Sequence, residues 1–186
     1  MPLRDKHPPE PFTARVMMET PLGLVLMTFS DMGLQRLDFP EDRSLFQEKA
    51  VAHTPEAIPV PEKILEDWRN RTIEALEGYF AGKLVSFENL ILDVLGTTFY
   101  VRVWQELRRI PYGETVSYQR LARLLGKPQA ARAVGQACGA NPLPLIIPCH
   151  RVIAANGSLG GFSSGLPRKR WLLEHEQVRL GKVSAR

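Results

Sequence analysis

The chain has 186 residues, of which 44% are hydrophobic and 24% charged, and this composition is that of a globular protein rather than a disordered one. No apolar run approaches the roughly 20 residues of a membrane span, and the first residues lack the apolar segment of a secretory signal. Two cysteines, Cys138 and Cys149, exclude a disulfide-rich secreted scaffold, so we expect a cytoplasmic protein that makes no membrane contact.

The formal net charge of +4 hides a strong asymmetry along the chain. Residues 1–95 contain 10 Lys and Arg against 16 Asp and Glu, whereas residues 96–186 contain 14 against 4. The two parts therefore carry net charges of −6 and +10. A basic half-chain favours a polyanionic partner, with nucleic acid as the first candidate, and a basic surface without a partner is the alternative.

The N-terminal half has the pattern of a small sheet with one helix. Segments rich in Val, Leu, Met and Phe, separated by turn residues, predict three short strands over residues 15–19, 22–29 and 33–39. The polar stretch from Pro40 to Pro61 is predicted to be mostly loop. From Pro61 to Lys83 apolar residues fall at helical spacing, and Gly82 suits the end of that helix. We assign this α/β unit to a first domain, residues 1–92.

The second half, residues 93–186, is predicted to be a mostly helical domain, which makes the whole chain an α+β protein. Helical spacing and capping residues predict helices over about 97–110, 118–125, 128–139 and 167–180. The second and third of these are short and are joined by a turn that contains Gly126. This is the pattern of a helix-turn-helix, although many such helix pairs do not bind DNA.

The helix predicted over residues 128–139 consists largely of Ala and Gly. A helix that reads the major groove needs long polar side chains, whereas small residues let a backbone approach the narrow minor groove. Arg132 is the long cation of this helix and would probe the base stack. The candidate DNA contacts are Gln129, Ala131, Arg132 and Gly135, together with Tyr118 and Arg151. Alternatively, the alanines pack the helix tightly against the core.

The strongest local signal is IPCHRV, residues 147–152, in which Cys149 and His150 are adjacent. A cysteine is only about 3% ionised at neutral pH, so a nucleophilic thiol needs a base or a cation beside it. His150 is the candidate base, Arg151 would favour the thiolate, and a carboxylate would orient the imidazole. The acidic residues of this half are Glu106, Glu114, Glu174 and Glu176. A buried structural cysteine beside a core histidine is the competing interpretation.

Other kinds of site receive less support from the sequence. The spacing of Cys138, Cys149, His150 and His175 matches no compact zinc module, and a disulfide is not expected in a reducing compartment. The loop Gly160–Gly165 is rich in glycine but lacks the phosphate-binding patterns of nucleotide enzymes. We therefore predict no metal and no cofactor. The basic run Pro167–Arg170 is either a localisation signal or a helix start near a DNA backbone.

Several segments between residues 96 and 177 resemble the O6-alkylguanine-DNA alkyltransferase family in order and spacing. They are GETVSYQRLA at 113–122, RAVGQA at 132–137, Asn141–Pro142, IPCHRV at 147–152 and KRWLLEHE at 169–176. The resemblance implies a ribonuclease-H-like N-terminal domain and a winged-helix-like C-terminal domain with a helix-turn-helix. It also implies that an alkylated guanine is flipped out of duplex DNA through the minor groove, and that its O6-alkyl group moves irreversibly to a cysteine.

Carried over by motif position, the resemblance makes Cys149 the alkyl acceptor, His150 its base acting through a water, and Glu176 the residue that orients His150. Asn141 would lie in the turn between the recognition helix and the acceptor, and Tyr118 would donate a proton to the guanine. Such a reaction needs neither a metal nor a cofactor. The expected partner is double-stranded DNA that contains O6-alkylguanine, with O4-alkylthymine as a second candidate substrate.

The resemblance also implies that Arg132 fills the gap left by the flipped base. It places the alkyl pocket at Pro144, Val152, Gly160, Phe162, Ser163, Ser164 and Lys169, with Lys169 at the rim. Two positions depart from the family pattern, since Phe162 stands where a tyrosine is usual and Ser164 where a glycine is usual. We expect a monomer and leave open whether molecules cluster along DNA. The competing hypotheses are a non-enzymatic protein that only recognises alkylation damage, a helix-turn-helix regulator and a thiol hydrolase.

Overall fold

The computed structural model describes residues 14–41 and 61–177, and all structural statements concern these residues. The N-terminal half begins with an antiparallel sheet in the order β1-β2-β3. Its strands are β1 (Ala14–Thr20), β2 (Gly23–Phe29) and β3 (Leu34–Asp38). All three predicted strands are confirmed, and no strand end differs from its prediction by more than one residue. Of the predicted loop, residues 42–60 lie outside the described part of the chain.

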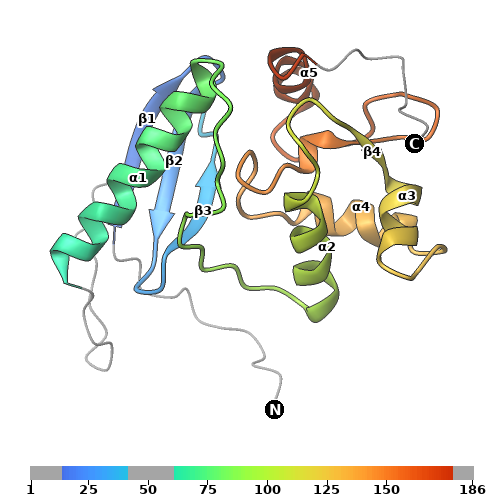
Figure 1. Ribbon diagram of the computed structural model, residues 1–186, viewed down its shortest axis with the longest axis horizontal. Coiled ribbons are helices and arrows are strands. Elements are labelled where there is room, and N and C mark those ends of the chain that lie inside the picture. Colours follow the sequence, from blue (N-terminus) through green and yellow to red (C-terminus); the bar gives the residue numbers. More distant parts are fainter. Residues whose placement is uncertain (1–13, 42–60, 178–186) are drawn as a thin grey trace.

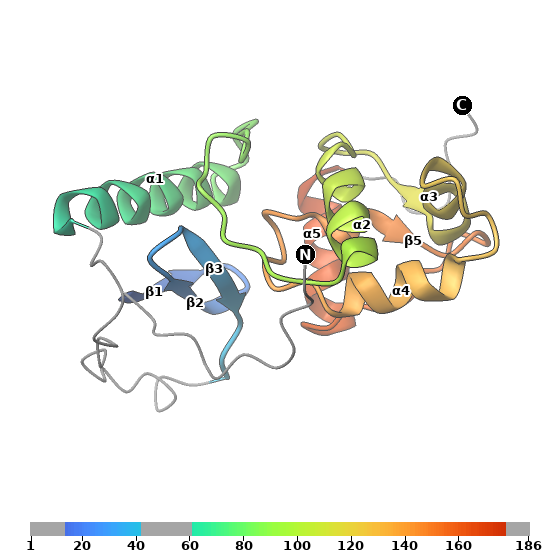
Figure 2. The ribbon, with the colours of Figure 1, turned by 90° about the horizontal axis from the view of Figure 1, so that it is seen from below.

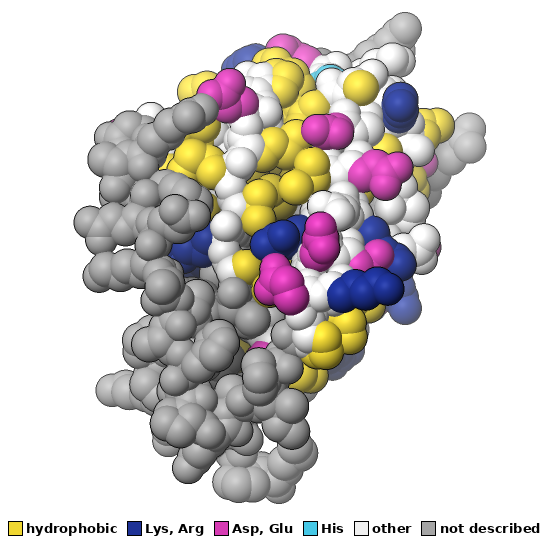
Figure 3. Space-filling view, turned by 90° about the vertical axis from the view of Figure 1, so that its left-hand side faces the viewer, with side chains coloured by type: hydrophobic (Ala, Val, Ile, Leu, Met, Phe, Trp, Pro, Cys, Tyr) yellow, Lys and Arg dark blue, Asp and Glu magenta, His cyan; other side chains and the backbone are white. Residues whose placement is uncertain are grey.

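One helix, α1 (Glu62–Phe80), lies across the sheet and contacts β1 (Figure 1). Its predicted apolar face is confirmed, because Leu65, Leu76 and Tyr79 are buried. Burial of this face against the sheet removes apolar surface from water, and this stabilises both elements. The outer face at this end of the molecule mixes acidic and basic side chains with hydrophobic ones (Figure 3).

The C-terminal half is mostly helical, as predicted (Figures 1 and 2). Its longer helices are α2 (Thr98–Arg108), α3 (Tyr118–Leu124), α4 (Ala131–Gly139) and α5 (Leu166–His175). Its shorter elements are β4 (Val116–Ser117), the 3₁₀ turn η2 (Cys149–Arg151) and β5 (Val152–Ile153). β4 and β5 pair in parallel. Side chains cap two helices, since Thr97 accepts from the Tyr100 N–H and Ser117 from the Arg120 N–H.

Two helix boundaries differ from the prediction. α4 begins at Ala131 instead of residue 128, because the chain first makes a turn in which the Ala130 N–H donates to the Lys127 carbonyl over 2.8 Å. α5 ends at His175 instead of residue 180, and Gln177 then takes a left-handed conformation with φ of 58°. Glu176 still donates its N–H to the Leu172 carbonyl over 2.9 Å, so its side chain follows the buried face of α5 and the residue is 1% exposed.

The two halves share one apolar core and several polar contacts. The Leu37 N–H of β3 donates to the Pro142 carbonyl over 2.9 Å. Arg168 of α5 donates to the Leu22 carbonyl over 3.2 Å, and its guanidinium lies 5.1 Å from the centre of the Phe39 ring. These contacts hold the sheet against the helical half next to residues of the predicted pocket.

Candidate active site

Cys149 lies at the start of η2 and is 2% exposed. The Asn141 side chain donates its Nδ2–H to the Cys149 sulfur over 3.0 Å and to the Ile147 carbonyl over 2.8 Å. Its Oδ1 accepts from the Leu143 N–H over 3.0 Å, so the loop that follows α4 fixes the orientation of the side-chain amide. Asn141 therefore connects the end of α4 to the thiol, as the resemblance implied.

Burial raises the pKa of the Cys149 thiol to about 11, although the Asn141 hydrogen bond and the charge of Lys169 act against this shift. Cys149 is therefore a thiol, not a thiolate, at neutral pH. The expectation that Arg151 favours the thiolate is not met, because this guanidinium is directed at Glu176. A nucleophilic role for Cys149 then requires that its proton leave during the reaction.

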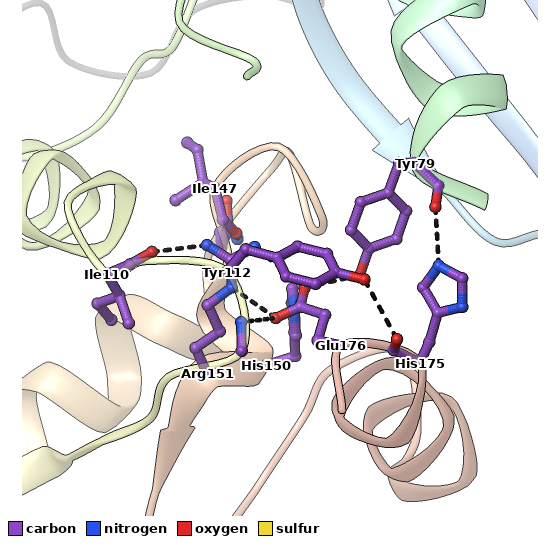
Figure 4. Close-up of polar contacts among 10 residues, drawn as sticks. Tyr79, Ile110, Tyr112, Ile147, His150, Arg151, His175 and Glu176 are labelled. Carbon is purple, nitrogen blue, oxygen red and sulfur yellow. Dashed lines mark hydrogen bonds and ion pairs between the residues drawn. The ribbon is translucent and has the colours of Figure 1, made fainter. Parts of the chain in front are cut away.

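His150 supplies a base in the required protonation state. Its Nε2 lies 2.8 Å from Glu176 Oε1, and both side chains are fully buried (Figure 4). Burial lowers the pKa of His150, and the hydrogen bond with Glu176 opposes this only in part, so the imidazole is neutral. Because an ionised carboxylate can only accept, the imidazole proton lies on Nε2. The Nδ1 atom is consequently a bare acceptor, and it is buried with no hydrogen-bond partner among the described residues.

Glu176 is surrounded by donors. Arg151 donates to both of its oxygens, from Nε over 2.9 Å and from Nη2 over 3.0 Å, and the Gly113 N–H donates to Oε2 over 3.3 Å. Burial acts to raise the pKa of this carboxyl, but the hydrogen bonds and charges of His150 and Arg151 outweigh it and hold the pKa well below the usual range. Glu176 is therefore ionised, and it orients the imidazole as expected.

Arg151 does not fit the DNA contact expected of it. Its side chain is mostly buried, and besides Glu176 it donates from Nη1 to the Ile110 carbonyl over 2.6 Å. This guanidinium uses three of its five N–H donors inside the protein and is mostly buried, so it offers little surface to a phosphate. Arg151 instead neutralises the charge of Glu176 inside the protein.

Tyr118, the first residue of α3, lies between the predicted DNA-binding helix and the predicted pocket loop. A Cβ atom on Gly135 of α4 would lie 3.8 Å from its ring, and one on Gly160 would lie 2.9 Å from it. Gly160 also has φ of +67°, so both conformation and space require glycine there. The Tyr118 hydroxyl donates to the Gly161 carbonyl over 3.4 Å, and burial raises its pKa, so it is protonated at neutral pH.

The helix pair α3–α4 presents the expected cation. Arg132 and Gln129 are exposed, whereas Ala131 and Gly135 are half-buried. The second interpretation of the alanine-rich helix also holds for its other face, since Val134, Ala137 and Cys138 are buried against the core. The Trp104 indole of α2 fixes that face by donating to the Ala137 carbonyl over 2.8 Å. One face of α4 is thus core, and the other carries Arg132.

A cavity of about 610 Å³ lies beside Asn141, between the two halves. Among the predicted pocket residues, Pro144, Ser163 and Ser164 line it. The opposite wall comes from β3 and the residues after it, from Arg36 to Pro40. No sequence pattern indicated that the N-terminal half forms part of this wall.

The remaining predicted pocket residues occupy other places. Phe162 lies edge-on to the His150 ring, with the ring centres 6.5 Å apart. Lys169 is not at a rim, because it is fully buried and its ammonium donates to the carbonyls of Val152 over 2.5 Å and Gly161 over 3.0 Å. Burial lowers the pKa of Lys169 to about 8. With Lys169 buried and Arg168 bound to the N-terminal half, the run Pro167–Arg170 is not a free basic segment.

One residue of this site, on α1, carried no functional signal in the sequence. Tyr79 of α1 donates its hydroxyl proton to Glu176 Oε1 over 2.7 Å (Figure 4). The helical spacing marked it only as a core position. The available signal was its residue type, because a buried tyrosine generally requires a hydrogen-bond partner.

Within residues 14–41 and 61–177, no three His, Cys, Asp or Glu side chains come together in a way that would hold a metal ion. In the same part of the chain, none of the helices has the length and apolar character needed to cross a bilayer.

Comparison with known proteins gives consistent matches. Residues 98–178 match the family model described as 6-O-methylguanine DNA methyltransferase, DNA binding domain. A methylated-DNA–protein-cysteine methyltransferase of Methanosarcina barkeri is 41% identical over 165 residues, which are 88% of this chain and 96% of that protein. The protein of the same name from Mycobacterium tuberculosis is 53% identical over 107 residues, 58% of this chain and 64% of its own length. The crystal structure of Mycobacterium tuberculosis OGT in complex with DNA matches with a TM-score of 0.70 and 39% identity, over 87% of this chain and 91% of that one.

Proposed function

Because the chain belongs to the methylated-DNA–protein-cysteine methyltransferase family, we propose that it repairs O6-alkylguanine in duplex DNA by moving the alkyl group to its own Cys149. The observation that carries this assignment is the arrangement around the thiol. Asn141 holds the Cys149 sulfur, and the neighbouring His150–Glu176 pair has a bare, buried Nδ1 atom. A thiol beside a neutral, oriented imidazole is an acceptor that can be deprotonated as it reacts.

The proton of Cys149 leaves as the sulfur attacks. No hydrogen bond of the described residues joins the sulfur directly to His150, so we propose that one water carries the proton to Nδ1. The imidazolium that forms is stabilised by Glu176, which is already ionised and fixed by Arg151. Burial of the thiol disfavours its charged form at rest, and therefore deprotonation is coupled to the arrival of the substrate.

The transfer itself forms a bond between the sulfur and the alkyl carbon and breaks the bond between that carbon and guanine O6. The electron pair of the broken bond stays with the guanine, which becomes more basic. Tyr118 donates a hydrogen bond at guanine N3 and relieves this charge. The guanine then takes up one proton, which balances the proton that Cys149 passed to His150. To restore the thiol, the bond between the sulfur and the alkyl carbon would have to be cleaved, and no group of the site does this. Each molecule therefore reacts once.

The approach to DNA follows from α4. Small side chains on its exposed side let the helix come close to the minor groove, and Arg132 occupies the stack when the damaged base flips out. Flipping costs a few kcal/mol, less when alkylation has weakened the base pair. The +10 charge of residues 96–186 supplies attraction to phosphates. In this proposal α2–α4 with β4 and β5 form the winged-helix-like unit, and the sheet with α1 is the ribonuclease-H-like unit of residues 1–92.

The alkyl group of the flipped base would point toward Asn141 and the cavity beside it, where Pro144, Ser163 and Ser164 lie. O4-alkylthymine presents the same kind of alkyl–oxygen bond and is a second candidate substrate. The protein acts as a monomer in this proposal, since a single chain supplies every group that the reaction uses. Its cytoplasmic location stays a prediction.

The decisive experiment measures the mass of the Cys149 peptide after reaction. The protein is mixed with a slight excess of duplex DNA that carries one O6-methylguanine, and it is then digested. We expect one methyl group on Cys149, in a burst equal to the amount of protein, and none with undamaged duplex. Cys138 is the internal control, because burial raises the pKa of this thiol to about 12. Among the described residues no basic side chain is hydrogen-bonded to its sulfur.

Cys149→Ser is the matched variant, and it should bind the damaged duplex without transferring the group. An unmodified Cys149 in the wild type, together with tight binding to the lesion, would replace the proposal by a damage-recognition protein without enzymatic activity. Repeated turnover with release of methanol would indicate a hydrolase instead.

A further inference from the structure

Tyr79 belongs to the N-terminal half, yet it reaches the centre of the acceptor site (Figure 4). It lies in the last turn of α1 and is 1% exposed. Its hydroxyl donates to Glu176 Oε1 over 2.7 Å, and its backbone carbonyl accepts from His175 Nε2 over 2.7 Å. His175, the last residue of α5, and Glu176, which follows it, therefore both bind Tyr79 of α1.

The ring of Tyr79 is fixed by other rings. The ring centres of His175, Phe87 and Tyr112 lie 5.2, 5.9 and 6.1 Å from its own. A side chain packed in this way has few alternative rotamers, so the direction of its hydroxyl is set by the fold around it. The position of α1 thus determines where the Tyr79 proton points.

The oxygen that Tyr79 contacts is the one that holds His150. Glu176 Oε1 accepts from Tyr79 over 2.7 Å, faces His150 Nε2 over 2.8 Å and accepts from Arg151 Nη2 over 3.0 Å. Each additional donor withdraws negative charge from a carboxylate oxygen, and this weakens its attraction for the imidazole proton. The Tyr79 hydroxyl therefore opposes the effect that Glu176 has on His150.

We propose that Tyr79 is a positioning residue of the acceptor site, through which the N-terminal half fixes the Glu176 carboxylate and keeps His150 neutral and able to take the thiol proton. This inference rests on the proposed function, because it assigns a role in the proton path of the transfer. It also gives the N-terminal half a defined part in the reaction.

The charged and titratable groups around His150 and Glu176 come from several elements. They are Cys149 and Arg151 of η2, Lys169 of α5, Tyr112 of the loop before β4, and Tyr79 of α1. Burial raises the pKa of Tyr79 and the charge of Glu176 raises it further, so the hydroxyl remains a donor at all pH values at which the protein works. Removing this hydroxyl changes the hydrogen bonding of Glu176 without removing a charge.

The test compares Tyr79→Phe with wild type in the rate of a single methyl transfer from duplex DNA carrying one O6-methylguanine, measured from pH 5 to pH 9. Loss of one donor lets Glu176 stabilise the imidazolium more strongly, so His150 protonates at higher pH. We expect the acid limb of the rate profile to move upward by roughly half to one pH unit, and the rate below it to fall roughly three- to tenfold.

Tyr112→Phe is the matched control. It removes a hydroxyl from the same aromatic cluster, but that hydroxyl donates to the His175 carbonyl over 3.2 Å and not to Glu176. We expect it to keep the wild-type limb. The inference would be overturned if the acid limb of Tyr79→Phe stayed at the wild-type pH, with or without a uniform loss of rate at every pH. A hydroxyl with a purely structural role would give that result.

A second readout does not depend on transfer. The nitrogen chemical shifts of His150, followed by NMR against pH in the free protein, should show a higher pKa in Tyr79→Phe than in wild type. Equal titration in the two proteins would overturn the inference even if the variant were less stable. Failure of wild-type protein to methylate Cys149 would overturn the proposed function, and this control is read separately from the His150 titration.

Discussion

The two halves of the molecule bury different kinds of polar side chain. In the described part of the N-terminal half the buried polar residues are the hydroxyl residues Thr28, Ser30 and Thr72. In the C-terminal half they are Asn141, His150, Arg151, Lys169 and Glu176. Hydroxyl groups are satisfied by nearby partners at little cost, whereas buried ionisable groups are costly unless they are paired.

This difference separates a supporting structure from a reactive one. The N-terminal half contributes strands and a helix to the apolar core, and none of its described charged residues is buried. Acidic and basic side chains lie on its outer face (Figure 3). The C-terminal half places a carboxylate, a guanidinium, an imidazole and an ammonium inside the protein, close to a thiol. Perturbed ionisable groups gather where chemistry is done, so their distribution alone indicates which half reacts. Tyr79 is the exception, since it belongs to the first half and acts in the second.

The largest expected effect is a difference in stability between two variants, each of which removes one buried polar group from one half. Glu176→Gln leaves the buried Arg151 guanidinium without its counter-ion, and we expect the free energy of unfolding to fall by about 3–5 kcal/mol. Ser30→Ala removes a hydroxyl that donates to Asp93 Oδ2 over 2.6 Å, and the expected loss is about 1–2 kcal/mol. Urea unfolding of both variants measures the difference, and equal losses would contradict the contrast between the halves.

The pH dependence of the same pair sharpens this comparison. Because the pKa of folded Glu176 lies below its ordinary value of 4.5, its stabilisation is present above pH 4.5 and is lost as the pH falls toward the folded pKa. His150 adds to the loss at low pH, since its lowered pKa means that the unfolded chain binds the proton first. The stability gap between wild type and Glu176→Gln should therefore narrow below pH 4.5.

An intermediate effect is expected from arginines that are exposed in the two halves. Arg132→Ala removes the side chain that is proposed to replace the flipped base, and transfer from duplex DNA should slow by about tenfold. Within the described residues Arg71 of α1 pairs with Asp67 on its own helix, so Arg71→Ala should leave the rate unchanged. Single-turnover rates on the methylated duplex give this comparison. Transfer from free O6-methylguanine base should be the same in all three proteins, and a normal duplex rate for Arg132→Ala would remove its assigned role.

The smallest effect concerns the contact between the halves. Arg168→Met removes the hydrogen bond to the Leu22 carbonyl and the contact with the Phe39 ring, and we expect a loss of about 1 kcal/mol in the free energy of unfolding. Chemical denaturation, followed by tryptophan fluorescence, measures it. A much larger loss would mean that the two halves depend on each other more than this hydrogen bond and ring contact indicate.

Most of the fold could be predicted because its signals are local. Apolar periodicity identified the strands and α1, and the capping residues Thr97 and Ser117 marked the starts of α2 and α3. The two misplaced boundaries, before α4 and after α5, lie where the chain makes a turn without a glycine. At Gln177 the chain takes a left-handed conformation, and no local pattern marks this residue as the end of the helix.

The site was predictable as a set of residues but not as a network. The motif around Cys149 identified the thiol, its histidine and Asn141, which lie close in the sequence. The roles of Arg151 and Lys169 were wrong because the sign of a charge does not show whether it points to solvent or into the core. Tyr79 was missed because it lies 97 residues from Glu176 along the chain, and only the packing of α1 brings them together.

The burial of Cys149 has a consequence for the lifetime of the unused protein. Oxidants and soluble electrophiles attack exposed thiolates, and the first product of oxidation, a sulfenic acid, would already block alkyl transfer. Cys149 is 2% exposed, and with a pKa of about 11 only about one molecule in ten thousand is ionised at neutral pH. A protein that can react only once is therefore kept unreactive until a damaged base enters. The packing that delays its reaction also determines how long it stays active in the cell.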